Sequence, residues 1–431
     1  QNSTARIREA FEDLDGRAVL RKLRRGAAQS LTGWRGEFWR CLLVSRLEDR
    51  LETIKRFLWL YIIGHCPVLE LLFDTNRLVT LRKSVKRRTE IRPIGIGESL
   101  EKVSDGVWLT LLKEDMRAAS LPFGFACAIP AGNEALAKDI QIELESAGDH
   151  TSVCKRDGQN FFPSLERFFL ILDAGKLCPA FGLYVLRKLR RPTSYTLEIG
   201  DSGPGNPVYL DWRTISGIVQ GKAVSFMLAC IVSIQRMKLW TDILTSYFPA
   251  IHTAQQYQPA ELTDLSPTTQ AALSEWAEQH DLPGLRRETD ELARCEGHGL
   301  TVSIRGFVDD KTIVTPSPLV SASLGLLGVV YKEVGVSFRL DKDEVWQVSS
   351  SGGLIIAGLP VWRINVPSLA AQPLEVESTP DTLLTTGVGS DKWLSETVGP
   401  AIRQAATDCV ELLELMTKHA RPGRPVVLLN L

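Results

Sequence analysis

The 431-residue chain lacks the patterns that mark several large classes of protein. It has no run of 18 apolar residues, and the apolar stretch at residues 57–63 is too short to cross a bilayer. Its eight cysteines form no Cys-x-x-Cys pair; Cys295 and His298 are one pair of metal-ligand type, whereas structural zinc needs about four ligands. Scattered cysteines are typical of a reducing compartment. We therefore expect an intracellular protein without a membrane segment and without zinc.

The net charge of −1 hides an uneven distribution of charge along the chain. Residues 1–104 contain 21 Lys and Arg against 13 Asp and Glu, a balance of +8. Residues 241–300 contain 3 against 10, a balance of −7. A basic N-terminal part is expected of a protein that binds phosphate backbones, although ordinary solvated helices are often basic too.

The length exceeds that of a usual single core, so we expect two or three subdomains. Residues 1–75 have apolar side chains at helical spacing, and Gly64 and Pro67 interrupt the pattern. The Trp and Phe residues in this part are more typical of a core than of a stacking surface.

Residues 303–314 contain the pattern on which the rest of the interpretation depends. Two runs rich in Val, Ile and Thr flank the adjacent pair Asp309 and Asp310, a pattern that predicts a β-hairpin. Adjacent carboxylates repel each other, and a hard cation such as Mg²⁺ relieves that repulsion. A plain solvated turn is the alternative interpretation of the pair.

A third aspartate follows a short predicted strand at residues 151–154. Asp157 stands where that strand passes into a loop and a helix, so it could reach a metal ion held at the Asp309–Asp310 turn. Phe162, five residues later, would then lie under the sugar of a nucleotide whose phosphates contact the metal.

A basic segment lies between residues 76 and 104. A predicted strand at residues 78–81 is followed by a cluster of Lys and Arg that includes Lys83, and then by Arg92-Pro93. Pro93 keeps Arg92 on an extended segment, where a guanidinium group can bind phosphate oxygens bidentately. A solvated basic hairpin is the alternative.

Gly217 and Gly221 lie on either side of Gln220, just before a long apolar pattern at helical spacing that begins near Val224. Gly217 and Gly221 would allow the backbone to approach a ligand closely. The alternative is an ordinary loop that leads into a buried helix.

Five short motifs occur along the chain in a fixed order. They are Arg92-Pro93-Ile94-x-Ile96-Gly97, Asp157-x-x-Asn160-x-Phe162-x-Ser164-x-x-Arg167, Gly217-x-x-Gln220-Gly221, Phe307-Val308-Asp309-Asp310 and Gly335-x-x-Phe338-x-x-x-Lys342-x-Glu344. Residues 355–360 are similar to a primer-gripping hairpin. In this order the motifs resemble the reverse transcriptase domain of non-long-terminal-repeat retrotransposons, a group II intron-like type of RNA-directed DNA polymerase.

The resemblance implies an α+β fold, a right-hand polymerase with an antiparallel-sheet palm, helical fingers and a helical thumb. It divides the chain into an N-terminal extension and fingers (1–150), palm with part of the fingers (151–238), an acidic helical insertion (239–300), palm with catalytic hairpin and primer grip (301–365), and a linker with a thumb-like helix (366–431). The insertion is expected to be a surface excursion that could bind a protein partner.

The resemblance also implies roles for individual residues. Asp157, Asp309 and, more peripherally, Asp310 would hold two Mg²⁺ ions, which Mn²⁺ could replace. The residues implied to contact substrates are Lys83 and Arg92 for the triphosphate, Phe162, Gln220 and Gly221 for the nucleotide pocket, Lys342 for the leaving phosphate, and Phe307 and Gly358 for the primer. The expected partners are an RNA template, a DNA primer and dNTPs, and a eukaryotic retrotransposon protein would act in the nucleus.

Two features bear on the chemistry within this resemblance. Phe162 would exclude a 2′-hydroxyl, which favours DNA over RNA as the product, and an RNA-directed RNA polymerase stays a minor alternative. Lys222-Ala223 stand where the family usually has Asp-Pro, and Arg339 where it usually has Asn. The first departure favours another alternative, an inactive polymerase fold that binds nucleic acid as a scaffold or splicing-type cofactor.

Overall fold

The structure is a computed structural model with a mixed α+β fold. It describes residues 3–21, 23, 31, 35–41, 48–66, 75–82, 91–145, 150–199, 208–253, 255–257, 265–297, 299–339, 343–348, 354–356, 382–383 and 386–387. Lys83, Lys342, Gly358 and the predicted thumb helix therefore lie outside the described residues.

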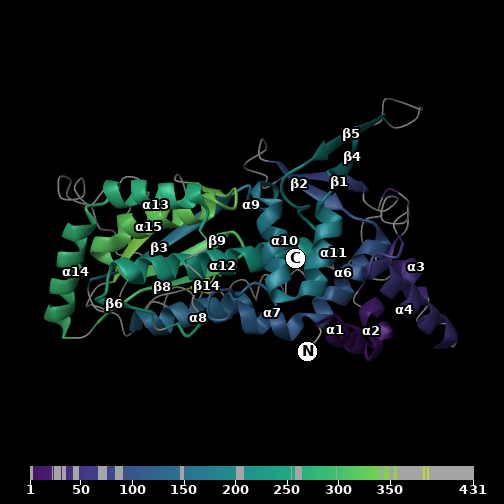
Figure 1. Ribbon diagram of the computed structural model, residues 1–431, viewed down its shortest axis with the longest axis horizontal. Helices are drawn as coiled ribbons and strands as arrows, with labels where there is room; N and C mark the ends of the chain where they lie inside the picture. Colours follow the sequence, from purple (N-terminus) through teal and green to yellow (C-terminus); the bar gives the residue numbers. More distant parts are fainter. Residues whose placement is uncertain are drawn as a thin grey trace, which may run out of the picture.

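An antiparallel sheet, here called the large sheet, is built from both halves of the chain (Figure 1). Its strand order is β12-β11-β3-β9-β8, and β10 pairs with the end of β3. The bounds are β3 (Thr151–Gln159), β8 (Ser303–Phe307), β9 (Asp310–Pro316), β10 (Ser337–Phe338), β11 (Glu344–Val348) and β12 (Leu354–Ile356). The predicted hairpin at residues 303–314 is confirmed, because β8 and β9 are antiparallel neighbours.

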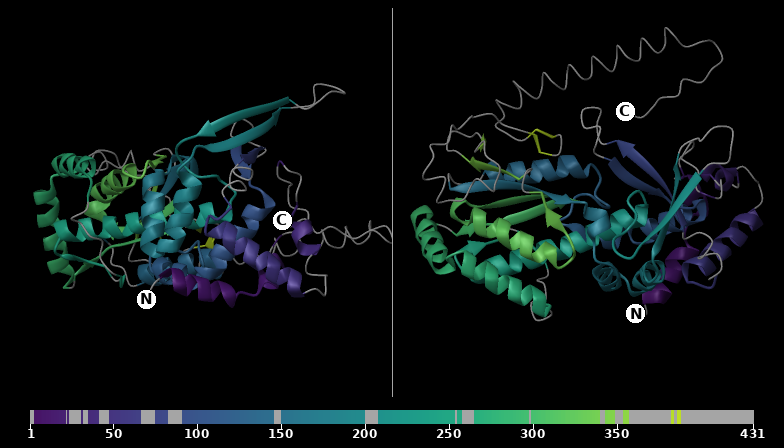
Figure 2. Two further views of the ribbon diagram at one scale, coloured as in Figure 1. Left: turned by 45° about the vertical axis from the view of Figure 1, so that its right-hand side comes forward. Right: turned by 90° about the horizontal axis from the view of Figure 1, so that it is seen from above.

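Helices pack on both faces of the large sheet (Figure 2, right). One face carries Cys154 and Ile313 into the main core with α12 (Ala223–Tyr247) and α15 (Val320–Lys332). The other face carries Val153 and Val314 against the apolar side of α8 (Gly132–Glu145). Because successive residues of a strand point to opposite faces, one strand can serve both cores.

A second sheet, the small sheet, has the strand order β2-β1-β4-β5. Its strands are β1 (Thr75–Arg82), β2 (Ile91–Ile96), β4 (Thr193–Ile199) and β5 (Val208–Thr214). β1 and β2 are antiparallel neighbours, which confirms the predicted strand at residues 78–81 and the extended segment that carries Arg92, whereas β1 and β4 run parallel. The β4–β5 hairpin extends away from the body of the molecule (Figures 1 and 2).

Helices surround the junction of the two sheets. They are α6 (Ser99–Leu111), α7 (Lys113–Ser120), the single turn α9 (Phe161–Ser164), α10 (Arg167–Leu177) and α11 (Pro179–Leu189). The N-terminal helices α1 (Ser3–Glu12), α2 (Gly16–Arg21), α3 (Gly36–Cys41) and α4 (Glu48–Ile62) pack beside them. Trp39 Nε1 donates to Ser99 Oγ at 3.0 Å, and Arg6 pairs with Asp115 at 2.7 Å, so these helices are tied to α6 and α7.

The predicted insertion differs from a simple surface excursion. Residues 239–247 continue α12, and Trp240 and Leu244 are fully buried there, so the expected boundary at residue 238 falls inside a core helix. Two short strands, β6 (Ile251–His252) and β7 (Leu300–Thr301), pair in parallel and close the base of the excursion. The 3₁₀ turn η2 (Ser317–Leu319) and the pair β13 (Thr382–Leu383) and β14 (Thr386–Gly387) complete the described elements.

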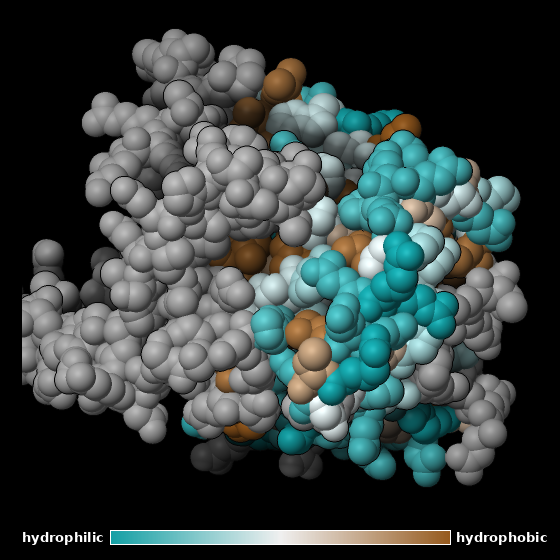
Figure 3. Space-filling view, turned by 90° about the vertical axis from the view of Figure 1, so that its left-hand side faces the viewer, coloured by the Kyte–Doolittle hydropathy of each residue, from teal (hydrophilic) through white to brown (hydrophobic). Residues whose placement is uncertain are grey.

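Helices α13 (Pro267–Gln279) and α14 (Leu282–Glu296) form one end of the molecule (Figure 1). The described surface at this end is mainly hydrophilic, with apolar residues in separate spots (Figure 3). Beneath that surface, Trp276 is 2% exposed and its Nε1 donates to the Ala322 carbonyl of α15 at 3.0 Å. The α13 helix is therefore part of the core.

One described helix, α12, is long and apolar enough to cross a membrane by length and composition. Of its most apolar window, 78% is buried inside the protein. Helix α12 is therefore apolar because it is a central core helix, and it packs on α6, α10, α15 and β8.

We expect Trp276→Ala to lower the free energy of unfolding by about 3–5 kcal/mol, because it leaves a cavity between α13 and α15 and removes a buried hydrogen bond. Phe168→Ala, at a side chain that is 66% exposed on α10, is the matched control and should have little effect. Urea unfolding measures both. Equal effects of the two substitutions would show that α13 is not part of the core.

Candidate functional site

The Asp309–Asp310 pair lies at a tight turn between two strands of the large sheet. β8 ends at Phe307 and β9 begins at Asp310, and these two residues pair across the hairpin. Val308 has a φ of 59°, in the left-handed region that a β-branched residue rarely adopts. The hairpin therefore holds a strained backbone next to its carboxylates, as functional turns often do.

Asp157 is directly opposite Asp310 in the ladder between β3 and β9. Residues opposite each other in an antiparallel pair project from the same face of the sheet. A second contact holds the turn to β3, because the Gly158 amide donates to the Asp309 carbonyl at 3.1 Å. The structure thus brings Asp157 next to a pair of adjacent aspartates that lies more than 150 residues later in the chain.

The three carboxylates interact electrostatically. Burial, followed by the neighbouring charges of Asp309 and Asp157, raises the pKa of Asp310 to about 6, while Lys155 acts in the opposite direction. Among the described residues, no three His, Cys, Asp or Glu side chains form a group that could by itself hold a metal ion. The donors still suit Mg²⁺, because this ion is commonly held by one or two carboxylates and completed by water and substrate phosphates.

Lys311, which the motif analysis does not single out, lies directly beneath the turn. Its side chain is fully buried and its Nζ donates to the Val308 carbonyl. The same ammonium group is 5.0 Å from the ring centre of Phe161 and 5.3 Å from that of Tyr331. Burial lowers the pKa of Lys311 to about 8, although Asp309 and Asp310 oppose this shift. The sequence gives no signal for this role beyond the position of Lys311 in β9, two residues before the core residue Ile313.

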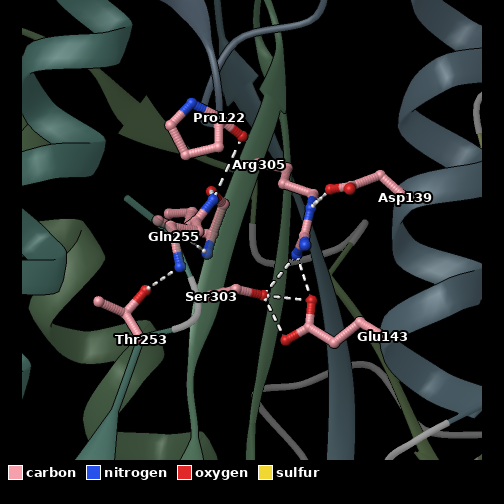
Figure 4. Close-up of polar contacts among 8 residues, drawn as sticks. Pro122, Asp139, Glu143, Thr253, Gln255, Ser303 and Arg305 are labelled. Atoms are coloured by element: carbon pink, nitrogen blue, oxygen red, sulfur yellow. Dashed lines mark hydrogen bonds and ion pairs between the residues drawn. The ribbon is translucent and has the colours of Figure 1, made fainter. Parts of the chain in front are cut away.

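Among the described residues, helix α8 covers one end of the face that carries Asp157 and Asp310. At the covered end, Arg305 binds Asp139 and Glu143 of α8, and Ser303 Oγ donates to Glu143 at 2.7 and 2.8 Å (Figure 4). At the other end Phe307 and the aspartates are half-buried. The carboxylates therefore lie on the accessible part of this face, and α8 fixes the strand that leads to them.

A loop at residues 215–222 approaches this site from the small sheet. The Ile218 amide donates to the Phe162 carbonyl at 3.0 Å, and the Gly217 amide donates to the Leu165 carbonyl at 3.0 Å. Gly217 has a φ of 70°, and a Cβ there would lie 2.2 Å from the Pro163 carbonyl oxygen. Only glycine fits this contact, so the loop can pack against the segment that carries Phe162.

The same loop contacts the strand that carries Arg92. The Gly95 amide of β2 donates to the Gln220 carbonyl at 2.8 Å. Gly221 has a φ of 106°, and a Cβ there would lie 2.8 Å from Ile94 Cγ2 and 3.1 Å from the Gly95 carbonyl oxygen. Arg92 itself is exposed, three residues along β2.

Arg167, the last residue of the second motif, organises the backbone around this loop. It donates to the carbonyls of Gly217 and Thr214, at 3.1 Å each, and to Thr193 Oγ1 at 2.7 Å. Two more hydrogen bonds, to the carbonyls of Leu189 and Arg191, are 3.0 and 2.6 Å long. Arg167 therefore has a structural role at its position in the motif. It joins α10 to the first residue of β4 and to the last residue of β5.

The described site residues form two connected groups. The first is the carboxylate group of Asp157, Asp309 and Asp310 with Phe307; the second consists of Arg92, Phe162, Gln220 and Gly221. Asn160, with a φ of 46°, and the turn α9 connect them along the chain. The predicted roles of Lys83, Lys342 and Gly358 are not tested, because these residues lie outside the described part of the chain.

Comparisons with known proteins give distant structural similarity alone. No protein-family model and no curated protein matches the sequence. Among solved structures, apo telomerase from Candida tropicalis, truncated from its C-terminal domain, aligns with 12% identity and a TM-score of 0.40. Telomerase from Candida albicans, in complex with a TWJ fragment of telomeric RNA, aligns with 12% identity and a TM-score of 0.37. Each alignment covers 72% of this chain, and 55% and 46% of the respective telomerase chains.

We expect Asp310→Asn to stabilise the metal-free protein by about 2 kcal/mol at pH 7.5, because it removes a charge disfavoured by burial and by its neighbours. A pKa raised from 3.8 to about 6 means that the folded state binds the proton more tightly than the unfolded state. The destabilisation is therefore complete above about pH 6 and nearly absent at about pH 4. Urea unfolding in EDTA at both pH values checks this; an equal gain at both would exclude charge as the cause.

Proposed function

We propose that this protein is an RNA-directed DNA polymerase that extends a DNA primer on an RNA template. The observation that carries the proposal is the register of the large sheet, in which Asp157 is opposite Asp310 and the turn between β8 and β9 holds Asp309. This is the arrangement that the order of the sequence motifs predicts. It supports the assignment of the large sheet as a palm and of the small sheet with its helices as fingers.

Asp157 and Asp309, with Asp310 beside them, are the residues that would hold two Mg²⁺ ions. When bound, such ions activate an attacking 3′-hydroxyl and stabilise a leaving pyrophosphate. The protein itself supplies the positions of the carboxylates. The strand ladder fixes Asp157 and Asp310, and the Gly158 amide and the Lys311 ammonium group hold the turn from two sides. Mn²⁺ would suit the same oxygen donors.

The second group of residues is proposed to bind the incoming nucleotide. Arg92 presents an exposed guanidinium group at the edge of the small sheet, where it can bind triphosphate oxygens. The Gln220 carbonyl is bound to the Gly95 amide of the same strand, and Phe162 lies half-buried, with its carbonyl bound to the Ile218 amide of the same loop. Lys83 and Lys342 are proposed to bind phosphates on the strength of their motif positions. Phe307, on the face of Asp310, is proposed to contact the primer end together with Gly358.

The alternative is a polymerase fold that binds nucleic acid without catalysis, as a scaffold or splicing-type cofactor. Lys222-Ala223 is the observation that favours it, because the family usually has Asp-Pro there. An RNA-directed RNA polymerase is a further alternative. The DNA polymerase is preferred over both because all three acidic positions are present and a phenylalanine stands at position 162. An intracellular site of action, in the nucleus for a eukaryotic retrotransposon protein, is part of the proposal.

We expect the protein to extend oligo(dT) on poly(rA) with dTTP and Mg²⁺, and Asp309→Asn to reduce the rate at least 100-fold, as loss of a metal-binding carboxylate should. Asp13→Asn, at an exposed position on the N-terminal part, is the matched control and should extend at the rate of the unmodified protein. Tight binding of primer–template without extension by the unmodified protein would instead support the scaffold.

We expect Phe162→Ala to raise the use of ribonucleotides relative to deoxynucleotides by about tenfold or more. Loss of the ring would remove the steric barrier to a 2′-hydroxyl, and one lost steric barrier is worth about 1–3 kcal/mol. Competitive incorporation of rUTP and dTTP measures the ratio. Phe161→Leu is the control, because Phe161 is buried under the turn and points to the core. Unchanged discrimination in Phe162→Ala would remove the reason for naming DNA as the product.

A further inference from the structure

The side chain of Lys222 turns into the protein rather than toward the nucleotide group. Its Nζ lies 2.6 Å from Glu101 Oε2 of α6, and only 15% of the lysine side chain and 6% of the glutamate side chain are exposed. Lys188 of α11 approaches the other carboxylate oxygen, Oε1, at 3.6 Å. One buried carboxylate is therefore shared by two cations, and one of the two comes from the loop next to Gln220 and Gly221.

The surroundings of this pair make it costly to disrupt. Burial acts to raise the pKa of Glu101, but Lys222 and then Lys188 outweigh burial and lower it, so the carboxylate is charged. Asp105 lies one helical turn further along α6, and burial followed by the charge of Glu101 raises its pKa to about 7. Tyr184 Oη, 3.5 Å from Asp105 Oδ1, also borders this region. Removal of Lys222 would leave Glu101 beside Asp105 with the cations Lys188 and Lys102.

The pair also touches the connection between β2 and α6. A Cβ at Gly97 would lie 2.6 Å from Glu101 Oε2 and 2.9 Å from Lys222 Cε, so the backbone at residue 97 passes directly over the ion pair. Two residues earlier, the Gly95 amide binds the Gln220 carbonyl at 2.8 Å. The loop is thus held to one strand-and-helix unit at two points, through its backbone at Gln220 and through its side chain at Lys222.

We propose that Lys222 is a positioning residue, whose ion pair with Glu101 holds the Gln220–Gly221 loop against β2 in the geometry that receives the nucleotide. The inference deepens the proposed function and rests on it. In this role Lys222 differs from the aspartate that the resembled family usually has at this position. The presence of a lysine here does not make the enzyme inactive, because the lysine charge is paired with Glu101 and does not point into the nucleotide group.

The experiment measures the loop itself and the reaction separately. Hydrogen exchange of the Gly95 amide reports the contact with Gln220 without any need for activity. We expect Lys222→Met to speed this exchange about tenfold or more while the amides of β3 and β9 keep their rates, because the opening is local. In primer extension, the same variant should raise KM for dTTP about fivefold or more and change kcat less than twofold. Lys222→Arg should restore both values.

Two further variants separate positioning from stability. Lys188→Met removes the other cation of Glu101 but leaves the loop attached, so it should lower the melting temperature and leave Gly95 exchange and KM near their original values. Glu101→Met combined with Lys222→Met removes both charges, so it should recover melting temperature relative to Lys222→Met while Gly95 exchange stays fast.

Unchanged Gly95 exchange in a folded Lys222→Met protein, or an equal acceleration of all amides, would overturn the proposal. A protein without polymerase activity whose Gly95 exchange responds as expected would keep the structural role of Lys222 and refute only the proposed reaction. A protein that extends primers but shows the same KM in Lys222→Met would keep the reaction and refute the positioning role.

Discussion

The structure depends on holding like charges together at the end of a sheet. Burial makes it costly to keep Asp310 ionised, and the neighbouring charges of Asp309 and Asp157 repel its carboxylate as well. Two features of the fold resist that repulsion. The ladder of β3 and β9 continues in register up to the aspartates, so separating them would break backbone hydrogen bonds. Beneath the turn, the Lys311 ammonium group offsets part of the negative charge and binds the Val308 carbonyl, between the rings of Phe161 and Tyr331. A buried lysine is itself unfavourable in an apolar core, and the carboxylates above it make that position tolerable.

The second constraint is that the backbone of residues 215–222 must pack directly against the backbone of neighbouring segments. Gly217 and Gly221 let the loop lie against the Phe162 segment and against β2 with no side chain between them. Arg167 donates to carbonyls from several segments at once, and so pairs backbone oxygens in and around an irregular loop. The nucleotide group is therefore assembled mostly by main-chain contacts. Its geometry depends on small residues and on one arginine more than on the side chains proposed to touch substrate.

Much of this arrangement could be predicted from the sequence, and what was missed has physical causes. The β8–β9 hairpin follows from runs rich in Val, Ile and Thr around a turn, and the motif order implies that Asp157 reaches that turn, but it does not give the register of β9 with β3. The roles of Lys311 and Glu101 could not be predicted in this way, because each depends on a partner more than 100 residues away or on rings from other elements. The boundary at residue 238 was wrong because the apolar pattern of α12 runs on through Trp240 to Leu244, and burial, not the local charge balance, sets the end of that helix.

The short parallel pairing of β6 with β7 has a consequence for how this fold can vary. It joins the point where the chain leaves α12 to the point where it enters β8, with the Leu300 amide bound to the Ala250 carbonyl at 3.1 Å and the Val302 amide bound to the His252 carbonyl at 2.9 Å. The two ends of the segment between these strands are therefore neighbours in space. Chain added to that segment need not displace the aspartate turn, because closing a longer loop between fixed ends costs little free energy. Loss of α13, by contrast, would remove Trp276 from the core.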